Sequence, residues 1–154
     1  MRLSQFTDYA LRVLLYIEAA GPHGPDSPPI ATGDIAEAYA ISKHHLLKVV
    51  AALAEHGYIE SVRGRSGGVR LLRPASEIRI GELVRAFEPM VIVECHDPET
   101  NTCPIAPVCK LAPALWRAAE AFARELDDLT LADMVPRRAP YAQILIEGSP
   151  RRDG

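Results

Sequence analysis

The sequence predicts a mainly α-helical protein with one small β-hairpin, and three observations support this fold class. Apolar residues recur at helical spacing across residues 5–20. Two shorter helical patterns follow each other closely within residues 32–56, which is the arrangement of a helix-turn-helix. Two alternating stretches within residues 58–72 surround a turn of Gly and Arg, and they predict a hairpin. A helix-turn-helix followed by a basic hairpin is a winged helix-turn-helix, which we assign to residues 1–74.

The first expected helix spans residues 5–20. Asp8 and Arg12 are four residues apart, so their side chains share one face of this helix. From the residues alone, a solvated ion pair explains these two charges as well as a functional role does. A loop with two Gly and four Pro, residues 21–29, ends the helix. The apolar face consists of Phe6, Ala10, Val13, Leu14 and Ile17.

The second helix of the helix-turn-helix is the one that we expect to read DNA. Thr32 caps the first helix, and Ser42 caps the second, which ends at Gly57. Polar residues near the N-terminal end of the second helix enter the major groove in this motif. The expected DNA-facing residues are Ser42, Lys43, His44, His45 and Lys48. The expected buried residues are Leu46, Leu47, Val50 and Leu53.

The turn of the hairpin is basic and free of bulky side chains. Four Arg residues and no acidic residue occur across residues 63–73. Such a tip can lie along the minor groove or the DNA backbone. The expected contacts are Arg63, Arg65, Ser66 and Gly67. The Gly-rich turn lacks the Gly-Lys-Ser/Thr ending of a nucleotide-binding loop, and it opens a strand rather than a helix.

All three cysteines of the chain lie in one Pro-containing segment, at Cys95, Cys103 and Cys109. Thiolates are soft ligands that suit an iron–sulfur cluster or Zn²⁺. A disulfide would leave one thiol over. Both kinds of metal centre usually take four ligands when closed, so a fourth must come from elsewhere. For a structural zinc site, Asp8 or His96 is the candidate.

Residues 75–136 form the second expected region, with the cysteine segment between two helices. The shorter helix covers about residues 80–88, and the longer one runs from after Cys109 to about Asp128. The longer helix has a wide apolar stripe, and we expect it to be a dimerisation helix. Thr130 caps a last helical turn, and residues 137–154 are expected to be a flexible polar tail. The stripe contains Leu111, Leu115, Ala119, Phe122, Leu126 and Leu129.

Composition and charge exclude several functional classes. Residues 1–74 carry eight basic and seven acidic residues, whereas residues 75–129 carry five and ten, so the basic character is local to the hairpin. No apolar run reaches the roughly 20 residues of a membrane span, and the first residues lack a signal peptide. We therefore expect a cytoplasmic protein with no membrane partner, where thiols stay reduced. No nucleophile motif is present, so we expect no enzyme.

Several stretches resemble the NsrR family of nitric-oxide-sensing repressors, which belongs with IscR and RirA to one group of winged-helix regulators. They are Ser4–Arg12, Val62–Leu71, Cys103–Leu111 and Leu129–Val135. The resemblance implies a homodimer with an iron–sulfur cluster in each subunit, most often 4Fe-4S with 2Fe-2S possible. The implied ligands are Cys95, Cys103 and Cys109, with Asp8 of the partner subunit as the fourth and Arg12 beside it. IscR-like members use a His where this chain has Ala112, and the gap between Cys95 and Cys103 is longer than usual.

The function implied by this resemblance is transcriptional repression. The dimer would bind double-stranded operator DNA, and nitric oxide would attack the cluster at its carboxylate-ligated iron and release the operator. A regulator of the same group that responds to redox state or iron supply is the alternative, because its ligand set would look alike. An electron carrier fits less well, since it needs neither a helix-turn-helix nor a wing.

Overall fold

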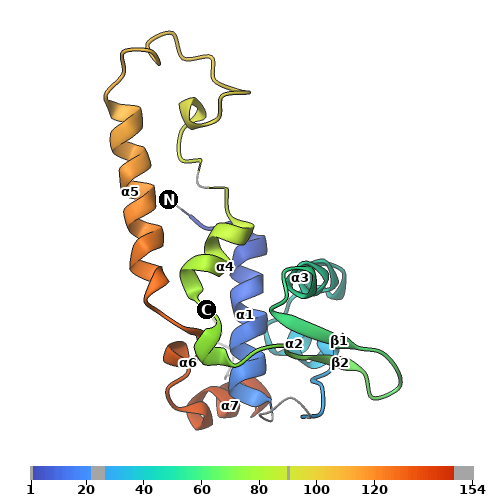
Figure 1. Ribbon diagram of the computed structural model, residues 1–154. Coiled ribbons are helices and arrows are strands. Elements are labelled where there is room, and N and C mark those ends of the chain that lie inside the picture. The colour runs from blue at the N-terminus through green and yellow to red at the C-terminus, as the bar shows by residue number, and fades with distance from the viewer. Residues whose placement is uncertain (1, 22–26, 90, 148–154) are drawn as a thin grey trace, which may run out of the picture.

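The computed structural model describes residues 2–21, 27–89 and 91–147. It confirms the predicted fold class, a mainly helical protein with a single two-stranded hairpin in these residues. Helix α3 and the hairpin lie on one side of α1, while α4 and α5 lie on the other (Figure 1). The elements are α1 (Gln5–Ala20), α2 (Thr32–Ala38), α3 (Lys43–Glu55), β1 (Ile59–Val62), β2 (Gly68–Leu71), η1 (Ala75–Glu77), α4 (Ile80–Phe87), η2 (Glu94–His96), α5 (Leu111–Asp127), α6 (Leu131–Met134) and α7 (Arg138–Glu147).

Helix α1 is the central element of the core. Ser4 caps it by accepting a hydrogen bond from the backbone N–H of Thr7 at 3.2 Å. The N–H of Gly21 closes the other end on the carbonyl oxygen of Ile17 at 2.9 Å. The predicted apolar face packs inward, and Val13 and Leu14 have no exposed surface. This helix therefore supports both the helix-turn-helix side and the α4 side.

The helix-turn-helix has a tight turn with a left-handed residue. Ala40 has a φ of 52°, and Ile41 after it is buried in the core. The prediction that Leu47 is buried is wrong, because this side chain is 57% exposed and Val49 is buried in its place. Leu46 and Leu47 are about 100° apart on a helix, so only one of them can face the core at that level. The first helix begins at Thr32 itself and has no side-chain cap.

The hairpin is joined to the chain that precedes α2. Strands β1 and β2 are antiparallel, with Ile59 opposite Leu71 and Val62 opposite Gly68. Ile30 also pairs with Val69, with backbone hydrogen bonds of 2.9 and 2.8 Å in the two directions. A Cβ on Gly68 would overlap the carbonyl oxygen of Ile30, so glycine permits this close approach of two backbones.

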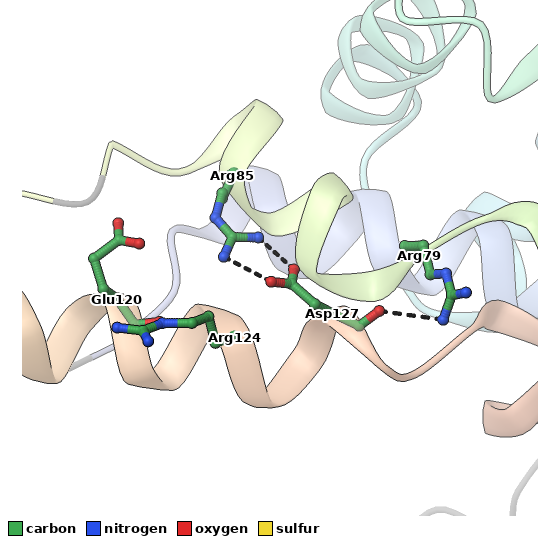
Figure 2. Close-up of polar contacts among 5 residues, drawn as sticks. All are labelled: Arg79, Arg85, Glu120, Arg124 and Asp127. Atoms are coloured by element: carbon green, nitrogen blue, oxygen red, sulfur yellow. Dashed lines mark hydrogen bonds and ion pairs between the residues drawn. The ribbon is translucent and has the colours of Figure 1, made fainter.

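Helices α4 and α5 are held together by close packing and by a two-pronged ion pair. A Cβ on Gly81 would overlap the Asp127 carboxylate, so α5 can approach α4 closely only at a glycine. Arg85 donates to both carboxylate oxygens of Asp127, one of them at 2.9 Å (Figure 2). Arg79 donates to the backbone carbonyl of Asp127 at 3.3 Å. The end of α5 is thereby fixed to α4.

The C-terminal part differs from the flexible polar tail expected for residues 137–154. Residues 138–147 form α7, which packs against α1, whereas residues 148–154 lie outside the described residues. Arg138 reaches the end of α1, where it donates to the backbone carbonyls of Glu18 and Gly21. Thr130 caps α6 as predicted, in a reciprocal pair with Asp133. Across the described residues, none of the helices combines the length and apolarity needed to cross a lipid bilayer.

Candidate functional site

The N-terminal end of α3 presents a continuous polar surface. Ser42, Lys43, His44, His45 and Lys48 are all exposed, as predicted for residues that meet a groove. The Ser42 hydroxyl accepts a hydrogen bond from the backbone N–H of His45 at 3.3 Å, so it also starts the helix. Exposed Leu47 lies within this polar surface. An apolar side chain at this place can contact a thymine methyl group.

The basic patch of the hairpin divides into two parts. Arg63, Arg65 and Ser66 are exposed at the tip, and Gly67 is partly exposed. Arg70 instead pairs with Glu60 across the two strands at 2.9 Å. Arg73 stacks on the ring of Tyr58, with its guanidinium carbon 4.9 Å from the ring centroid. Arg63 and Arg65 at the tip are therefore the exposed part of the basic patch.

Asp8 and Arg12 form an ion pair on α1, with Oδ2 and Nη2 2.9 Å apart. Their side chains are 44% and 42% exposed, respectively, which leaves both accessible to another group. The Arg12 guanidinium also lies 5.6 Å from the ring centroid of Tyr39, the last residue before the turn of the helix-turn-helix. Burial raises the pKa of the Tyr39 phenol, so Tyr39 stays neutral beside Arg12. Arg12 thus links Asp8 to the helix-turn-helix.

Glu88 is a contact that sequence reasoning missed. Its carboxylate accepts hydrogen bonds from the backbone N–H of Ser4 at 3.0 Å and from the Thr7 hydroxyl at 2.5 Å. A carboxylate at a helix N-terminus is favoured by the helix dipole. Because the partners are 84 and 81 residues apart, no local pattern could have identified this cap. Glu88, the C-cap residue of α4, thus ties the end of α4 to the turn of α1 that carries Asp8.

The cysteine segment, defined here as residues 91–110, is held mainly by short-range polar contacts. Asp97 accepts from the Thr100 hydroxyl at 2.8 Å, and Glu94 accepts from the backbone N–H of Thr102 at 3.1 Å. Cys95, Cys103 and Cys109 are all free and partly exposed. In the ranges that the structure describes, no three His, Cys, Asp or Glu side chains are gathered so as to hold a metal ion. The single chain therefore brings together Asp8 and Arg12, but not the predicted ligand set.

His96 provides an independent indication of metal chemistry in this segment. Its Nε2 lies 2.8 Å from the backbone carbonyl oxygen of Ala112 in α5. Its Nδ1 is buried and has no hydrogen-bond partner among the residues that the structure describes. Such an orphaned nitrogen beside Cys95, in a segment with two further free thiols, fits a soft metal centre. The signal in the sequence was the His that directly follows the first cysteine.

Comparison with known proteins identifies what this arrangement is similar to. The family model of Rrf2, described as iron-dependent transcriptional regulator, matches residues 3–137. The oxidized form of Staphylococcus aureus CymR is 28% identical, with a TM-score of 0.67 over 89% of this chain and 98% of that one.

Two further solved structures share the fold at lower identity. CymR (YrzC) of B. subtilis, titled the global cysteine regulator, is 24% identical, with a TM-score of 0.67 over 88% of this chain and 97% of that one. IscR of T. potens is 23% identical, with a TM-score of 0.61 over 88% of this chain and 87% of that one.

Proposed function

Because this chain belongs to the Rrf2 family of transcriptional regulators, we propose that it is a homodimeric repressor that senses nitric oxide through an iron–sulfur cluster. Membership makes it a DNA-binding regulator and not an enzyme. The observation that supports DNA docking is the shared exposure of the N-terminal residues of α3 and of the hairpin tip. A helix in the major groove with a basic tip beside it is the usual geometry of such proteins.

The dimer part of the proposal is supported by the uncovered face of α5. Ala119 and Ala123 are buried against the rest of the chain, but Leu111 is 64% exposed and Trp116 is 45% exposed. Leu115, on the same predicted stripe, is only partly covered. Phe122 and Leu126, further along the stripe, pack against the core of the same chain. The exposed apolar side chains in the first half of this 17-residue helix are therefore the ones that suit pairing with a second copy.

The cluster part of the proposal assigns Cys95, Cys103 and Cys109 as thiolate ligands, with Asp8 of the partner subunit as the fourth. A bound 4Fe-4S cluster, or a 2Fe-2S cluster in the same ligands, would supply the iron that reacts with nitric oxide. A carboxylate is a harder ligand than a thiolate and holds such iron less firmly, so Asp8 is the ligand most readily displaced.

The chain's own contacts suggest how ligand loss reaches the DNA. When Asp8 is a ligand, its charge is engaged outside its own subunit. When Asp8 is released, it is free to pair with Arg12 as in the single chain, where the two atoms are 2.9 Å apart. Arg12 also contacts Tyr39 at the turn before α3. The proposed switch is thus a change of partner at Asp8. It would alter the ion pair with Arg12 and, through Arg12, the contact with Tyr39.

A redox sensor is the second candidate, and one observation favours it. The similar S. aureus protein is titled as an oxidized form, and this chain also carries free, partly exposed thiols. Such a protein would respond to an oxidant through its thiols and would need no iron. The two candidates differ in the signal to which DNA binding responds.

The deciding experiment measures operator affinity of anaerobically purified dimer before and after nitric oxide or peroxide. We expect brown protein that loses operator affinity with nitric oxide in proportion to cluster absorbance. Colourless protein that loses affinity only with peroxide would replace this proposal with the thiol sensor. Two variants serve as a control for DNA docking. Lys48→Ala and Arg65→Ala are each expected to reduce the slope of log affinity against log salt concentration by about one, because one phosphate contact is lost.

Asp8→Ala tests the switch separately from the cluster. Cluster absorbance is expected to fall little, because three thiolates remain, but operator affinity is expected to fall even without nitric oxide. Asp8→Cys is expected to slow the reaction with nitric oxide, because a fourth soft ligand holds iron more firmly. If Asp8→Ala binds the operator and reacts like wild type, the ion pair with Arg12 is an ordinary surface contact.

A further inference from the structure

We propose that the cluster-free chain binds one Zn²⁺ ion through Cys95, Cys103, Cys109 and the Nδ1 atom of His96. All four ligands come from one subunit, whereas the cluster proposed above takes Asp8 from the partner subunit. The inference concerns a second state of the same segment. It does not depend on a cluster or on nitric oxide, so either proposal can fail without the other.

The hydrogen bond of His96 fixes which ring nitrogen has a free lone pair. The acceptor of Nε2 is a backbone carbonyl oxygen, which can only accept, so Nε2 must carry the proton. In the neutral ring, Nδ1 is then unprotonated and able to bind a metal. Metal-binding histidines nearly always donate their other N–H to a carbonyl or a carboxylate. The contact at 2.8 Å with Ala112 meets that condition.

The Nδ1 atom is buried and has no hydrogen-bond partner among the described residues, although buried polar atoms nearly always have one. The imidazole ring is held edge-on against Trp116, with centroids 5.5 Å apart. A ring held by both a hydrogen bond and an aromatic contact loses little further conformational freedom on binding a metal. A bound cation would give the orphaned nitrogen its missing partner.

The ligand types and their neighbourhood favour zinc in this state. Three thiolates and one imidazole form one of the closed tetrahedral sets of structural Zn²⁺. The thiols of the described chain are not gathered, so binding has to draw Cys103 and Cys109 toward Cys95 and His96. No residue from 91 to 110 is buried as a whole, so no packed core opposes that movement. Asp8 stays paired with Arg12 and is not needed.

The test titrates reduced, cluster-free, full-length protein with Co²⁺ as a visible probe and then with Zn²⁺ in competition with a coloured chelator. We expect one Co²⁺ per chain, with the intense bands of a tetrahedral thiolate site. His96→Ala should lower the Zn²⁺ affinity by more than about 100-fold, because loss of an outer-shell partner alone costs about 10–100-fold. His96→Cys should restore tight binding with a fourth thiolate. Asp8→Ala and the unrelated imidazole deletion His45→Ala should leave the affinity unchanged.

Nitrogen NMR of the wild-type ring provides a second measurement that needs no variant. We expect His96 to carry its proton on Nε2 without metal, and its Nδ1 resonance to move when Zn²⁺ is added. A His96→Ala protein with wild-type affinity, or a loss of affinity in Asp8→Ala instead, would overturn the assignment. A ring protonated on Nδ1 with Zn²⁺ bound would overturn it as well.

Discussion

The DNA-reading half of the chain and the cysteine segment are stabilised in opposite ways. Leu14, Ile35 and Leu53 of the first three helices have no exposed surface, and Val69 joins the hairpin to the same core. In the segment of residues 91–110, by contrast, no residue is buried. Its larger apolar side chains, Val91, Ile105 and Val108 among them, are exposed. The first region is specified by its own packing, whereas the second is held mainly by local polar contacts.

The largest expected contrast is between core and segment truncations. Leu14→Ala should lower the free energy of unfolding by about 2–5 kcal/mol, because it removes a fully buried side chain and leaves a cavity. Val108→Ala, at a side chain that is 79% exposed, should change it by no more than about 0.5 kcal/mol in metal-free protein. Urea unfolding measures both. Equal effects would show that the segment has a packed core of its own.

A smaller effect is expected where the hairpin meets the chain before α2. Gly68→Ala places a Cβ against the carbonyl of Ile30 and should cost about 1–3 kcal/mol, as overpacking does. Gly33→Ala is the matched control, since a Cβ added there would have no atom within 4 Å and its backbone is helical. That variant should be neutral or up to about 1 kcal/mol more stable. Thermal unfolding of both separates overlap from the general effect of replacing glycine.

The smallest expected effect concerns the exposed ion pair between α4 and α5. The hydrogen bonds from Arg85 hold the pKa of Asp127 below its ordinary value of 3.8. A lowered folded-state pKa means that the stabilisation is present above 3.8 and is lost as the pH falls through the lowered value. In a plot of melting temperature against pH, Asp127→Asn should therefore reduce the fall of the melting temperature at acidic pH, which is the acid limb of the curve. An unchanged limb would show that this pair does not contribute to folding stability.

Most of the fold could be predicted from the sequence because its signals are local. Residues 5–20 carry a helical apolar stripe, a signal that acts within one or two turns. The same locality explains the error at Leu47, since two neighbouring leucines satisfy the stripe equally well and only packing from other helices decides between them. Helix α7 was missed because its apolar residues do not form a one-sided stripe, and its anchor, Arg138, acts on the far end of α1.

The candidate site was predictable only in its ligand types. The three cysteines are evident from composition, but their relative positions depend on a segment without a packed core and on what binds it. The role of Glu88 arises from a contact 84 residues away, which no spacing rule encodes. Likewise, the lone pair on His96 is defined by a carbonyl in a different helix. Long-range polar geometry is the part of this protein that sequence patterns cannot supply.

The pairing of Ile30 with Val69 has a consequence for the operator. The hydrogen bonds of 2.9 and 2.8 Å join the hairpin to the chain that leads into α2, so in the proposed DNA complex the hairpin of each subunit would have a fixed reach. One inserted base pair between half-sites turns one of them by about 35° around the DNA axis, from about 10–10.5 base pairs per turn. A subunit with a fixed reach cannot follow that rotation by bending its hairpin. The protein is therefore expected to discriminate operators by the spacing of their half-sites more strongly than by single bases at their edges.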